Sequence, residues 1–276
     1  MTQRVVITGG GSGLGRALAL AYAARGAEVC ISDRNEEAGQ QVLQEIQASG
    51  GDGFFVPCDI TDSEQVAALA VAVGEHWQGI DVLINNAGVA TAGSLEYEDI
   101  EQWQWVLDVN VVGMVRVTRA MIGLLRVGAT SDTTAQLINI ASQAGITPIP
   151  MMGSYNAAKA AVVSFSETLH LELARDNISV TVACPSFFNT NLDQSLRSKQ
   201  PGFDKVVKKL LTRGSMTAEQ VATRIIRDAD SHRFMSITHP EGRKVYWMKR
   251  LLPNRWYLAM VKHKTQKMGQ PRDDKH

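Results

Sequence analysis

The sequence of 276 residues is poor in cysteine, and its six histidines are scattered. Its three cysteines, Cys30, Cys58 and Cys184, are odd in number, lie far apart and form no CxxC pair. This pattern excludes a disulfide framework and argues against a structural zinc site. None of the histidines shows the spacing of metal ligands, so we expect no bound metal. A reducing, cytoplasmic location fits these absences best.

Long hydrophobic runs are also absent. The longest apolar run, residues 66–73, is far shorter than the ~20 residues that a membrane-spanning helix needs. Residues 1–4 lead directly into an expected strand rather than into the apolar segment of a signal peptide. We therefore expect a protein that is neither secreted nor membrane-spanning.

The chain has no net charge, because 28 Lys and Arg residues balance 28 Asp and Glu residues. This balance gives no reason to expect nucleic acid as a partner. It hides a difference between the two ends, since residues 243–276 contain ten Lys or Arg against two Asp, a charge of +8 that leaves −8 for residues 1–242. We therefore divide the chain into a main domain, residues 1–242, and a basic C-terminal extension, residues 243–276.

Short β-branched runs alternate with segments of helical periodicity along most of the chain. Strands are expected at residues 4–8, 28–32, 53–57, 81–84, 135–141 and 179–183, and helices at 13–25, 35–49, 63–77, 100–125 and 154–175. Because alternating strands and helices need crossover connections, the pattern predicts an α/β fold with a doubly wound parallel sheet (Rossmann fold), a single domain with a basic, aromatic C-terminal tail. In such folds ligands bind at the carboxyl ends of the strands.

A glycine-rich turn, TGGGSGLG at residues 8–15, follows the first expected strand. Glycines at this place allow a tight turn and let backbone N–H groups and a helix N-terminus approach a pyrophosphate. A plain strand-to-helix turn is the alternative. We assign to cofactor binding Gly9, Ser12, Gly13, Leu14 and Gly15.

Asp33 ends the second expected strand, 18 residues after Gly15. An acidic residue about 20 residues beyond a glycine-rich turn accepts hydrogen bonds from the adenosine ribose, and its charge repels a 2′-phosphate. Asp33 therefore favours NAD over NADP. Arg34 offers the alternative of pairing with such a phosphate, and Asp33 could also cap the helix that follows.

Tyr155 and Lys159 stand four residues apart in an expected helix, so their side chains share one face. An ammonium group beside a phenol favours the phenolate, so we expect Lys159 to lower the pKa of Tyr155 from about 10 towards neutrality. Tyr155 would then take a proton from an alcohol or supply one to a carbonyl. Ser142, at the end of a strand, would hydrogen-bond and polarise the substrate oxygen. A solvated Tyr–Lys pair is the alternative.

These residues carry a resemblance to a known family. Thr8-Gly9-x-x-x-Gly13-x-Gly15, Asn85-Asn86-Ala87-Gly88, Asn110, Ser142 and Tyr155-x-x-x-Lys159 together resemble the short-chain dehydrogenase/reductase family, over about residues 3–240. The resemblance implies that residues 1–242 form a dinucleotide-binding catalytic domain. It also implies an NAD(P)-dependent oxidoreductase that interconverts a secondary alcohol and a carbonyl by hydride transfer. The competing interpretations are an NADP-linked carbonyl reductase and a non-catalytic dinucleotide sensor or scaffold.

The resemblance also implies individual roles. Asn110 would hold a water that relays protons to Lys159, which would itself grip the nicotinamide ribose. Where the family has Pro-Gly after the sixth strand, this chain has Pro185-Ser186, which we expect to stiffen the loop over the nicotinamide. The further cofactor contacts implied are Asp59 and Ile60 at the adenine, Asn86, Ala87 and Gly88 along the cofactor, Tyr155 and Lys159, and Pro185, Phe188 and Thr190 at the carboxamide.

The residues that by family position border the substrate are apolar: Ile146, Pro148, Ile149, Met151, Met152, Phe187, Phe188 and Leu192. No Lys or Arg is among them to hold a carboxylate or phosphate. We therefore expect a small lipophilic alcohol or ketone as the substrate. The alternative is that some of these side chains pack the core or a subunit interface.

The C-terminal extension interleaves aromatic and basic residues, and Pro253 is placed to begin a helix to about residue 268 in which Trp256, Met260 and Lys264 share a face. Such a helix could contact a membrane surface peripherally, or it could dock on the acidic remainder of the chain or on a partner subunit. The expected helix at residues 154–175 is apolar over more of its circumference than one sheet requires. We therefore expect a homodimer or homotetramer built around the helices at 100–125 and 154–175.

Overall fold

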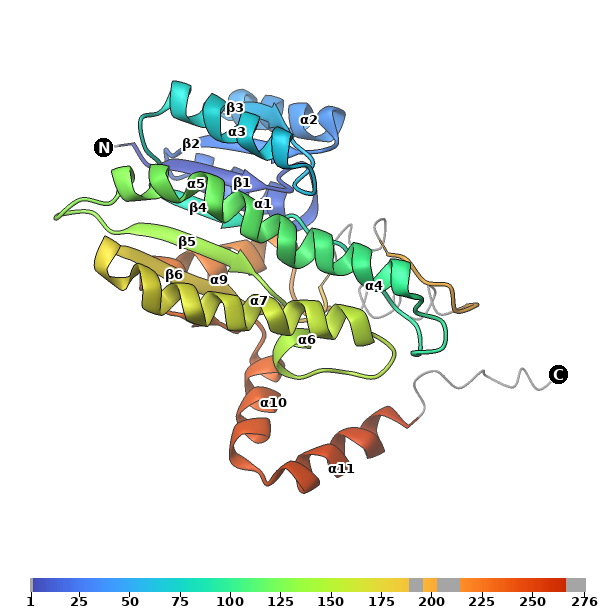
Figure 1. The fold of residues 1–276 in the computed structure, drawn as a ribbon. Coiled ribbons are helices and arrows are strands. Elements are labelled where there is room, and N and C mark those ends of the chain that lie inside the picture. The colour runs from blue at the N-terminus through green and yellow to red at the C-terminus, as the bar shows by residue number, and fades with distance from the viewer. Residues whose placement is uncertain (1, 189–195, 203–213, 267–276) are drawn as a thin grey trace.

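The computed structural model describes residues 2–188, 196–202 and 214–266 (Figure 1). Thr190 and Leu192, which we expected at the cofactor and at the substrate, lie outside the described residues. Among the described residues, no helix is both long enough and apolar enough to cross a membrane.

A parallel sheet of seven strands, in the order β3-β2-β1-β4-β5-β6-β7, runs through the centre of the fold. Because β1 pairs with both β2 and β4, the strand order reverses between β1 and β4. The predicted doubly wound parallel sheet is therefore confirmed, and a short edge strand is added to the six expected. The strands are β1 (Arg4–Thr8), β2 (Glu28–Asp33), β3 (Asp52–Pro57), β4 (Val82–Asn85), β5 (Ala135–Ile140), β6 (Ile178–Ala183) and β7 (Met235–Ser236).

Helices cover both faces of the sheet (Figure 1). One layer contains α1 (Gly13–Ala23), α2 (Glu36–Ala48) and α9 (Ala218–Asp230), and the other contains α3 (Ser63–His76), α4 (Ile100–Leu107), α5 (Met114–Gly128) and α7 (Gly153–Glu172). Every residue of β4 and β5 is buried, as the central strands of a sheet covered on both faces must be. Side-chain caps begin several helices: Asn35 accepts from Ala38 N at 3.1 Å, and Thr217 and Gln220 form a capping box.

The helix expected over residues 100–125 is interrupted. Between α4 and α5 the chain forms a π-helix, Asp108–Gly113, in which Asn110 is fully buried. A Cβ on Gly113 would lie 2.8 Å from Ile60 Cδ1, so a glycine is needed where this segment crosses Ile60. The wider turn brings Asn110 inward, and π-helical turns of this kind occur often at functional sites.

Beyond β7 the chain continues as two helices, α10 (Pro240–Leu251) and α11 (Asn254–Thr265), which project from the body of the fold (Figure 1). The boundary that we placed between residues 242 and 243 falls inside α10. The helix expected from Pro253 corresponds to α11, whose described part ends at Thr265. α6 (Gln143–Ile146), α9 and α10 were not among the expected helices, and the end of the helix expected at 154–175 forms a 3-10 helix (Leu173–Asp176).

Candidate active site

A cavity of about 770 Å³ lies at the carboxyl ends of the strands, beside the reversal in strand order. Gly15 and Asn110 do not line it, although both contact residues that do. Thr190 lies outside the described residues. The structure therefore brings together in one cavity most of the residues selected from the sequence: Gly9, Ser12, Gly13, Leu14, Asp33, Asp59, Ile60, Asn86, Ala87, Gly88, Ser142, Tyr155, Lys159, Pro185 and Phe188.

The glycine-rich turn forms a cradle that side chains would fill. Gly9 and Gly13 have φ angles of 63° and 52°, in the left-handed region that favours glycine. A Cβ on Gly15 would lie 2.0 Å from the carbonyl oxygen of Gly9. The first N–H groups of a helix have no intrahelical acceptor. Ser12 occupies the N-cap of α1, but its side chain makes no cap hydrogen bond to them. This arrangement fits the pyrophosphate of a dinucleotide.

Asp33 links the end of β2 to this turn. One carboxylate oxygen accepts from Gly11 N at 2.9 Å and the other accepts from Asn35 N at 2.9 Å. The carboxylate still borders the cavity, and the exposed Arg34 borders it beside Asp33. Asp33, which favours NAD, and Arg34, which favours NADP, therefore border the same part of the cavity.

Asn86 ties the end of β4 to the end of β1 and to the glycine-rich turn. Its side-chain amide donates to the carbonyl oxygens of Thr8 at 3.1 Å and Gly9 at 2.8 Å, while its backbone N–H donates to Thr8 Oγ1 at 3.1 Å. A Cβ on Gly9 would lie 2.7 Å from Ala87 Cα. The segment from Asn86 to Gly88 therefore packs directly on the turn and forms one floor of the cavity.

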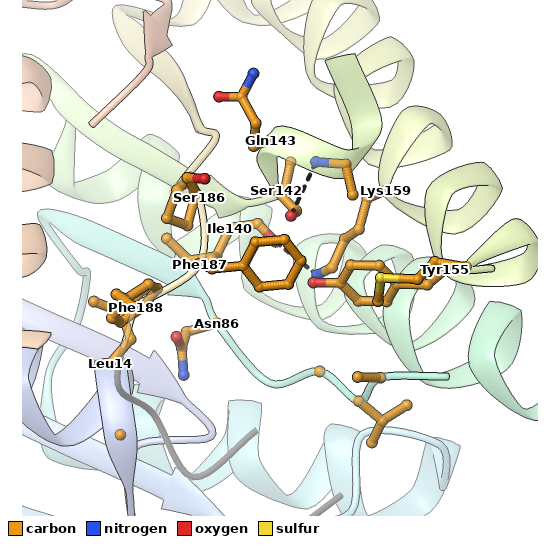
Figure 2. A pocket seen from close by; sticks show the side chains of 18 of the residues that line it. Leu14, Asn86, Ile140, Ser142, Gln143, Tyr155, Lys159, Ser186, Phe187 and Phe188 are labelled. Carbon is orange, nitrogen blue, oxygen red and sulfur yellow. Dashed lines mark hydrogen bonds between the residues drawn. The ribbon is translucent and has the colours of Figure 1, made fainter. Parts of the chain in front are cut away.

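Ser142, Tyr155 and Lys159 meet at the other end of the cavity (Figure 2). Ser142 follows β5 and caps α6, accepting from Ala144 N at 3.1 Å. Tyr155 and Lys159 lie on the first turns of α7, and the Lys159 ammonium lies 5.8 Å from the centre of the Tyr155 ring. Lys159 Nζ donates to the Ile140 carbonyl oxygen at 3.0 Å, which directs the amine towards the cavity end of β5.

Burial sets the protonation of this pair. Desolvation raises the pKa of Tyr155 above its ordinary value, and the Ser142 hydroxyl partly offsets this rise. Desolvation also lowers the pKa of Lys159 to about 8, with the neighbouring Cys184 acting in the opposite direction. The expectation that the pKa of Tyr155 falls towards neutrality is therefore wrong for this structure, because the cost of burying a phenolate dominates. At neutral pH Tyr155 is a neutral phenol.

Asn110 acts on the backbone beside this pair. Its side-chain oxygen accepts from Val89 N at 3.0 Å, and its amide donates to Val89 O at 2.9 Å. A Cβ on Gly88 would lie 2.7 Å from Asn110 Oδ1 and 3.4 Å from Lys159 Nζ. The side chain of Asn110 therefore holds the loop after β4 against Lys159. The water relay implied for Asn110 stays a prediction.

Glu98 is a site residue that sequence reasoning missed. It is buried, and its carboxylate accepts from Ser154 N at 3.0 Å and from Ser154 Oγ at 2.8 Å. Ser154 Oγ also pairs with Thr91 Oγ1 at 2.6 Å. A carboxylate at the N-terminus of a helix is stabilised by the helix dipole, so Glu98 secures the turn of α7 that carries Tyr155. Nothing in the local sequence links residues 98 and 154.

The substrate end of the cavity is mostly apolar. Of the residues expected there, Pro148, Ile149, Met152, Phe187 and Phe188 line it, whereas Ile146 and Met151 do not. A second wall comes from residues of the C-terminal extension, which were not selected as site residues. These are Val245, Tyr257, Met260, Val261, Lys264 and Thr265.

Two hydrogen bonds fasten the C-terminal wall to the body. Gln143 Nε2 donates to the Gly242 carbonyl oxygen at 3.3 Å, and Lys249 Nζ donates to the Ile146 carbonyl oxygen at 2.6 Å. Tyr257 is buried. Of the face predicted for this helix, Met260 and Lys264 line the cavity, whereas Trp256 does not and is 61% exposed. Lys264 adds a basic side chain to this wall, whereas the residues expected at the substrate include no Lys or Arg.

The loop after β6 is fastened to the C-terminal part as well. Ser186 N donates to His239 Nδ1 at 3.1 Å, and the Thr238 hydroxyl lies 2.8 Å from the same nitrogen. Burial lowers the pKa of His239, so the ring is neutral and Nδ1 accepts near neutral pH. This contact restrains the Pro185-Ser186 segment, where a stiff loop was expected.

Comparisons with known proteins agree with this geometry. The short chain dehydrogenase family model matches residues 3–201. The chain is 32% identical over 257 residues to a probable oxidoreductase, EphD, from Mycobacterium tuberculosis (strain ATCC 25618 / H37Rv), covering 90% of this chain but only 43% of that protein. It is 33% identical over 198 residues to a 3-oxoacyl-[acyl-carrier-protein] reductase from Synechocystis sp. (strain ATCC 27184 / PCC 6803 / Kazusa), covering 71% of this chain and 78% of the relative.

A solved structure is similar over the whole chain. The short chain dehydrogenase/reductase from Burkholderia phymatum, crystallised in complex with NAD, superposes with a TM-score of 0.82 at 29% sequence identity. The match covers 100% of this chain and 98% of that one. The similarity therefore includes the C-terminal helices as well as the sheet.

Proposed function

The chain belongs to the short chain dehydrogenase family, and we propose that within it the protein interconverts a secondary alcohol and a carbonyl compound with a nicotinamide dinucleotide. The observation that carries this proposal is the convergence of Ser142, Tyr155 and Lys159 at the end of the cavity that lies away from the glycine-rich turn. A dinucleotide bound with its pyrophosphate at the turn would extend along the cavity towards these three side chains.

The cofactor is NAD or NADP, and it supplies or accepts the hydride when bound. Asp33 supports NAD, because its carboxylate is held at the cavity edge by Gly11 N and Asn35 N and would repel a 2′-phosphate. Arg34 supports the alternative of an NADP-linked carbonyl reductase, because it borders the same part of the cavity. Asp59, Ile60, Asn86, Ala87, Gly88, Pro185 and Phe188 would complete the cofactor contacts.

In this proposal Tyr155 moves the proton and Ser142 binds the substrate oxygen. The hydroxyl of Ser142 polarises a carbonyl by hydrogen bonding, as an oxyanion donor does. Tyr155 is a neutral phenol at neutral pH, so it is ready to donate a proton to the oxygen of a carbonyl. Oxidation of an alcohol needs the phenolate instead. We therefore propose that reduction dominates near neutrality and that oxidation gains as the pH rises.

Lys159 contributes charge and position. Its ammonium near the Tyr155 ring favours the developing phenolate after proton transfer, and its amine would also hold the nicotinamide ribose. Because its pKa is lowered to about 8, this charge is lost at moderately alkaline pH. The mechanism therefore ties the rate of reduction to the charge on Lys159.

The substrate in this proposal is lipophilic. Pro148, Ile149, Met152 and Phe187 supply apolar walls, and the inner face of α11 adds Met260 and Val261. Lys264 would sit beside a polar end of the same molecule. A medium-chain hydroxy or oxo compound with an acidic or polar terminus matches this lining better than a small sugar does.

Assembly and location complete the proposal. Ile100, Val112 and Leu171, on or beside α4, α5 and α7, are 67%, 44% and 76% exposed, which supports a homodimer or homotetramer through this layer. The three cysteines are buried and unpaired, which supports a reducing cytoplasm. Sedimentation at micromolar concentration tests the assembly, and a monomer near 30 kDa would overturn it.

The test of the activity is absorbance of the reduced nicotinamide with a panel of ketones and secondary alcohols, run with NAD(H) and with NADP(H). Turnover of lipophilic carbonyls that is lost in Tyr155→Phe, with cofactor binding retained, is the expected result. Cofactor binding without turnover of any member of the panel would favour a dinucleotide sensor.

A further inference from the structure

The C-terminal helices expose several large apolar side chains among basic residues. Five large hydrophobic side chains of this segment are exposed to solvent: Trp247, Leu251, Leu252, Trp256 and Leu258 are 57%, 77%, 37%, 61% and 61% exposed. They lie on α10, on α11 and on the turn between the two helices. We call these five residues the tail patch. All five fall within residues 247–258, and exposed large apolar residues concentrated in this way mark a surface that contacts another molecule.

The inner face of α11 is distinct from the tail patch. On α11, Tyr257, Met260, Val261 and Lys264 recur at helical spacing and line the cavity. Trp256 and Leu258 lie on the two flanks of this inner face and are exposed to solvent. The tail patch is therefore not a core surface left uncovered, because the core-facing side of α11 is already used.

The tail patch lies in a strongly basic setting. Residues 240–266 contain seven Lys or Arg, namely Arg243, Lys244, Lys249, Arg250, Arg255, Lys262 and Lys264, against one acidic residue, Glu241. Within the described part of the chain, none of the seven forms an ion pair. Lys249 donates to a backbone carbonyl, and Arg250 contacts the Tyr246 ring and hydroxyl. Uncompensated cations here surround exposed Trp and Leu side chains.

We propose that the tail patch docks the protein on the surface of an anionic lipid bilayer. Interfacial helices combine Trp and Leu, which enter the boundary between headgroups and acyl chains, with Lys and Arg, which stay at the anionic headgroups. The projecting corner formed by α10 and α11 suits a flat, soft surface, because it offers a convex wedge (Figure 1). No helix of the described residues spans a membrane, so the contact is peripheral.

Docking would place the substrate end of the cavity at the membrane. One wall of that cavity is the inner face of α11, and in this proposal Trp256 and Leu258, which flank that face, contact the bilayer surface. A lipid-dissolved alcohol or ketone would then reach the cavity without crossing water. This advantage rests on the proposed function, whereas the docking itself does not, so docking is measured without cofactor or substrate.

The experiment is co-sedimentation of the full-length protein with vesicles of phosphatidylcholine alone and of phosphatidylcholine with 30% phosphatidylglycerol, at low and high salt. The expected result is binding to the anionic vesicles, at least tenfold weaker on the neutral ones and weakened by salt. A blue shift of the Trp fluorescence should accompany it, because Trp247 and Trp256 leave water. Equal binding to both vesicles, or none to either, would overturn the proposal.

Matched variants distinguish binding through the tail patch from nonspecific adsorption to vesicles through other exposed apolar residues. Leu251→Ala should weaken binding severalfold, whereas Leu95→Ala, which removes an equally exposed leucine (78% against 77%) from another part of the surface, should not. The pair Trp247→Ala and Trp256→Ala should weaken it at least tenfold. Equal effects of Leu251→Ala and Leu95→Ala would contradict the assignment of the tail patch.

Charge is tested with two pairs of variants that change the net charge by the same amount. The pair Lys244→Glu and Arg255→Glu should abolish binding to anionic vesicles, since each basic residue near such a surface adds roughly fivefold in affinity. The pair Arg119→Glu and Arg175→Glu, also exposed and outside ion pairs within the described residues, should leave it unchanged. If the tail-patch variants instead turn an oligomer into a smaller species in sedimentation and leave vesicle binding intact, the patch contacts a second copy and the proposal fails.

Discussion

Replacing Glu98 by alanine tests how the turn that carries Tyr155 is held. The Glu98 carboxylate is 4% exposed and accepts from Ser154 N at 3.0 Å and Ser154 Oγ at 2.8 Å, at the N-terminus of α7. In Glu98→Ala the buried Ser154 N–H loses its acceptor, which costs about 1–3 kcal/mol. The loss of a negative charge at the helix N-terminus adds about 0.3–1 kcal/mol. Part of this is recovered, because a buried carboxylate no longer has to be desolvated.

We therefore expect Glu98→Ala to lower the free energy of unfolding by roughly 2 kcal/mol. Glu98→Gln should lose less than half as much, because its amide oxygen still accepts from Ser154 N and its NH₂ donates to Ser154 Oγ. Urea denaturation followed by circular dichroism at pH 7 measures both values. Equal losses in the two variants, or a loss below about 0.5 kcal/mol in Glu98→Ala, would refute this account of Glu98.

Turnover supplies a second readout of the same variant. A displaced α7 turn moves the Tyr155 hydroxyl away from Ser142, so kcat should fall in Glu98→Ala while the KM for the cofactor changes little. Glu98→Gln should restore most of kcat. A Glu98→Ala enzyme that is destabilised but keeps its full kcat would show that the contact supports stability only.

Four further predictions concern the cavity itself. Tyr155→Phe should retain cofactor binding, measured by fluorescence titration, and lose about 10²-fold or more in kcat, since a positioned proton donor contributes 10² to 10⁴; a loss below about tenfold would contradict its role. Asp33→Ala should shift preference towards NADP in kcat/KM, with Asp33→Asn as the variant that removes the charge and keeps an acceptor for Gly11 N; a wild-type enzyme that already prefers NADP would transfer the assignment to Arg34. Gly15→Ala should abolish cofactor binding, because its Cβ would lie 2.0 Å from Gly9 O. The control Gly123→Ala, whose Cβ would meet nothing within 4 Å, should raise the free energy of unfolding by up to about 1 kcal/mol. Normal cofactor binding in Gly15→Ala would refute the role of the glycine-rich turn. The reduction rate should fall as the pH rises through about 8, where Lys159 loses its charge, and the oxidation rate should rise with pH as Tyr155 loses its proton; parallel profiles in the two directions would contradict the assignment.

The nucleotide half of the cavity could be predicted from the sequence because it follows local rules. The strand boundaries expected for β1, β2 and β4 differ from the structure by at most one residue, since buried parallel strands are continuous apolar runs. Gly9, Gly13 and Asp33 lie where a strand, a turn and a helix follow one another along the chain. Their order along the chain follows from this strand–turn–helix pattern, so the sequence was sufficient to select them, although Asp33 also bonds to Gly11 N and Gly9 packs on Ala87.

The parts that escaped prediction depend on contacts between distant segments. The π-helix at Asp108–Gly113 interrupts a periodic pattern that is typical of one long helix, because Asn110 bonds to the backbone of Val89. The protonation of Tyr155 depends on how deeply α7 is buried. Sequence spacing placed Lys159 beside the phenol but could not weigh that charge against desolvation.

The substrate half of the cavity is assembled from segments that are far apart in sequence. The residues proposed for proton transfer and those proposed to select the substrate therefore lie on different segments. Ser142 follows β5, and Tyr155 and Lys159 lie on α7, whereas one wall of the cavity comes from α11, more than 90 residues beyond Lys159. The links between the two are few: Gln143 with Gly242, and Lys249 with the Ile146 carbonyl. Changes at Met260, Val261 or Lys264 can therefore alter which carbonyl compound fits without moving the proton donor. Lys249→Met should loosen the wall and raise KM for large substrates with kcat preserved, and a fall in kcat alone would show that the C-terminal wall and the proton donor are mechanically coupled.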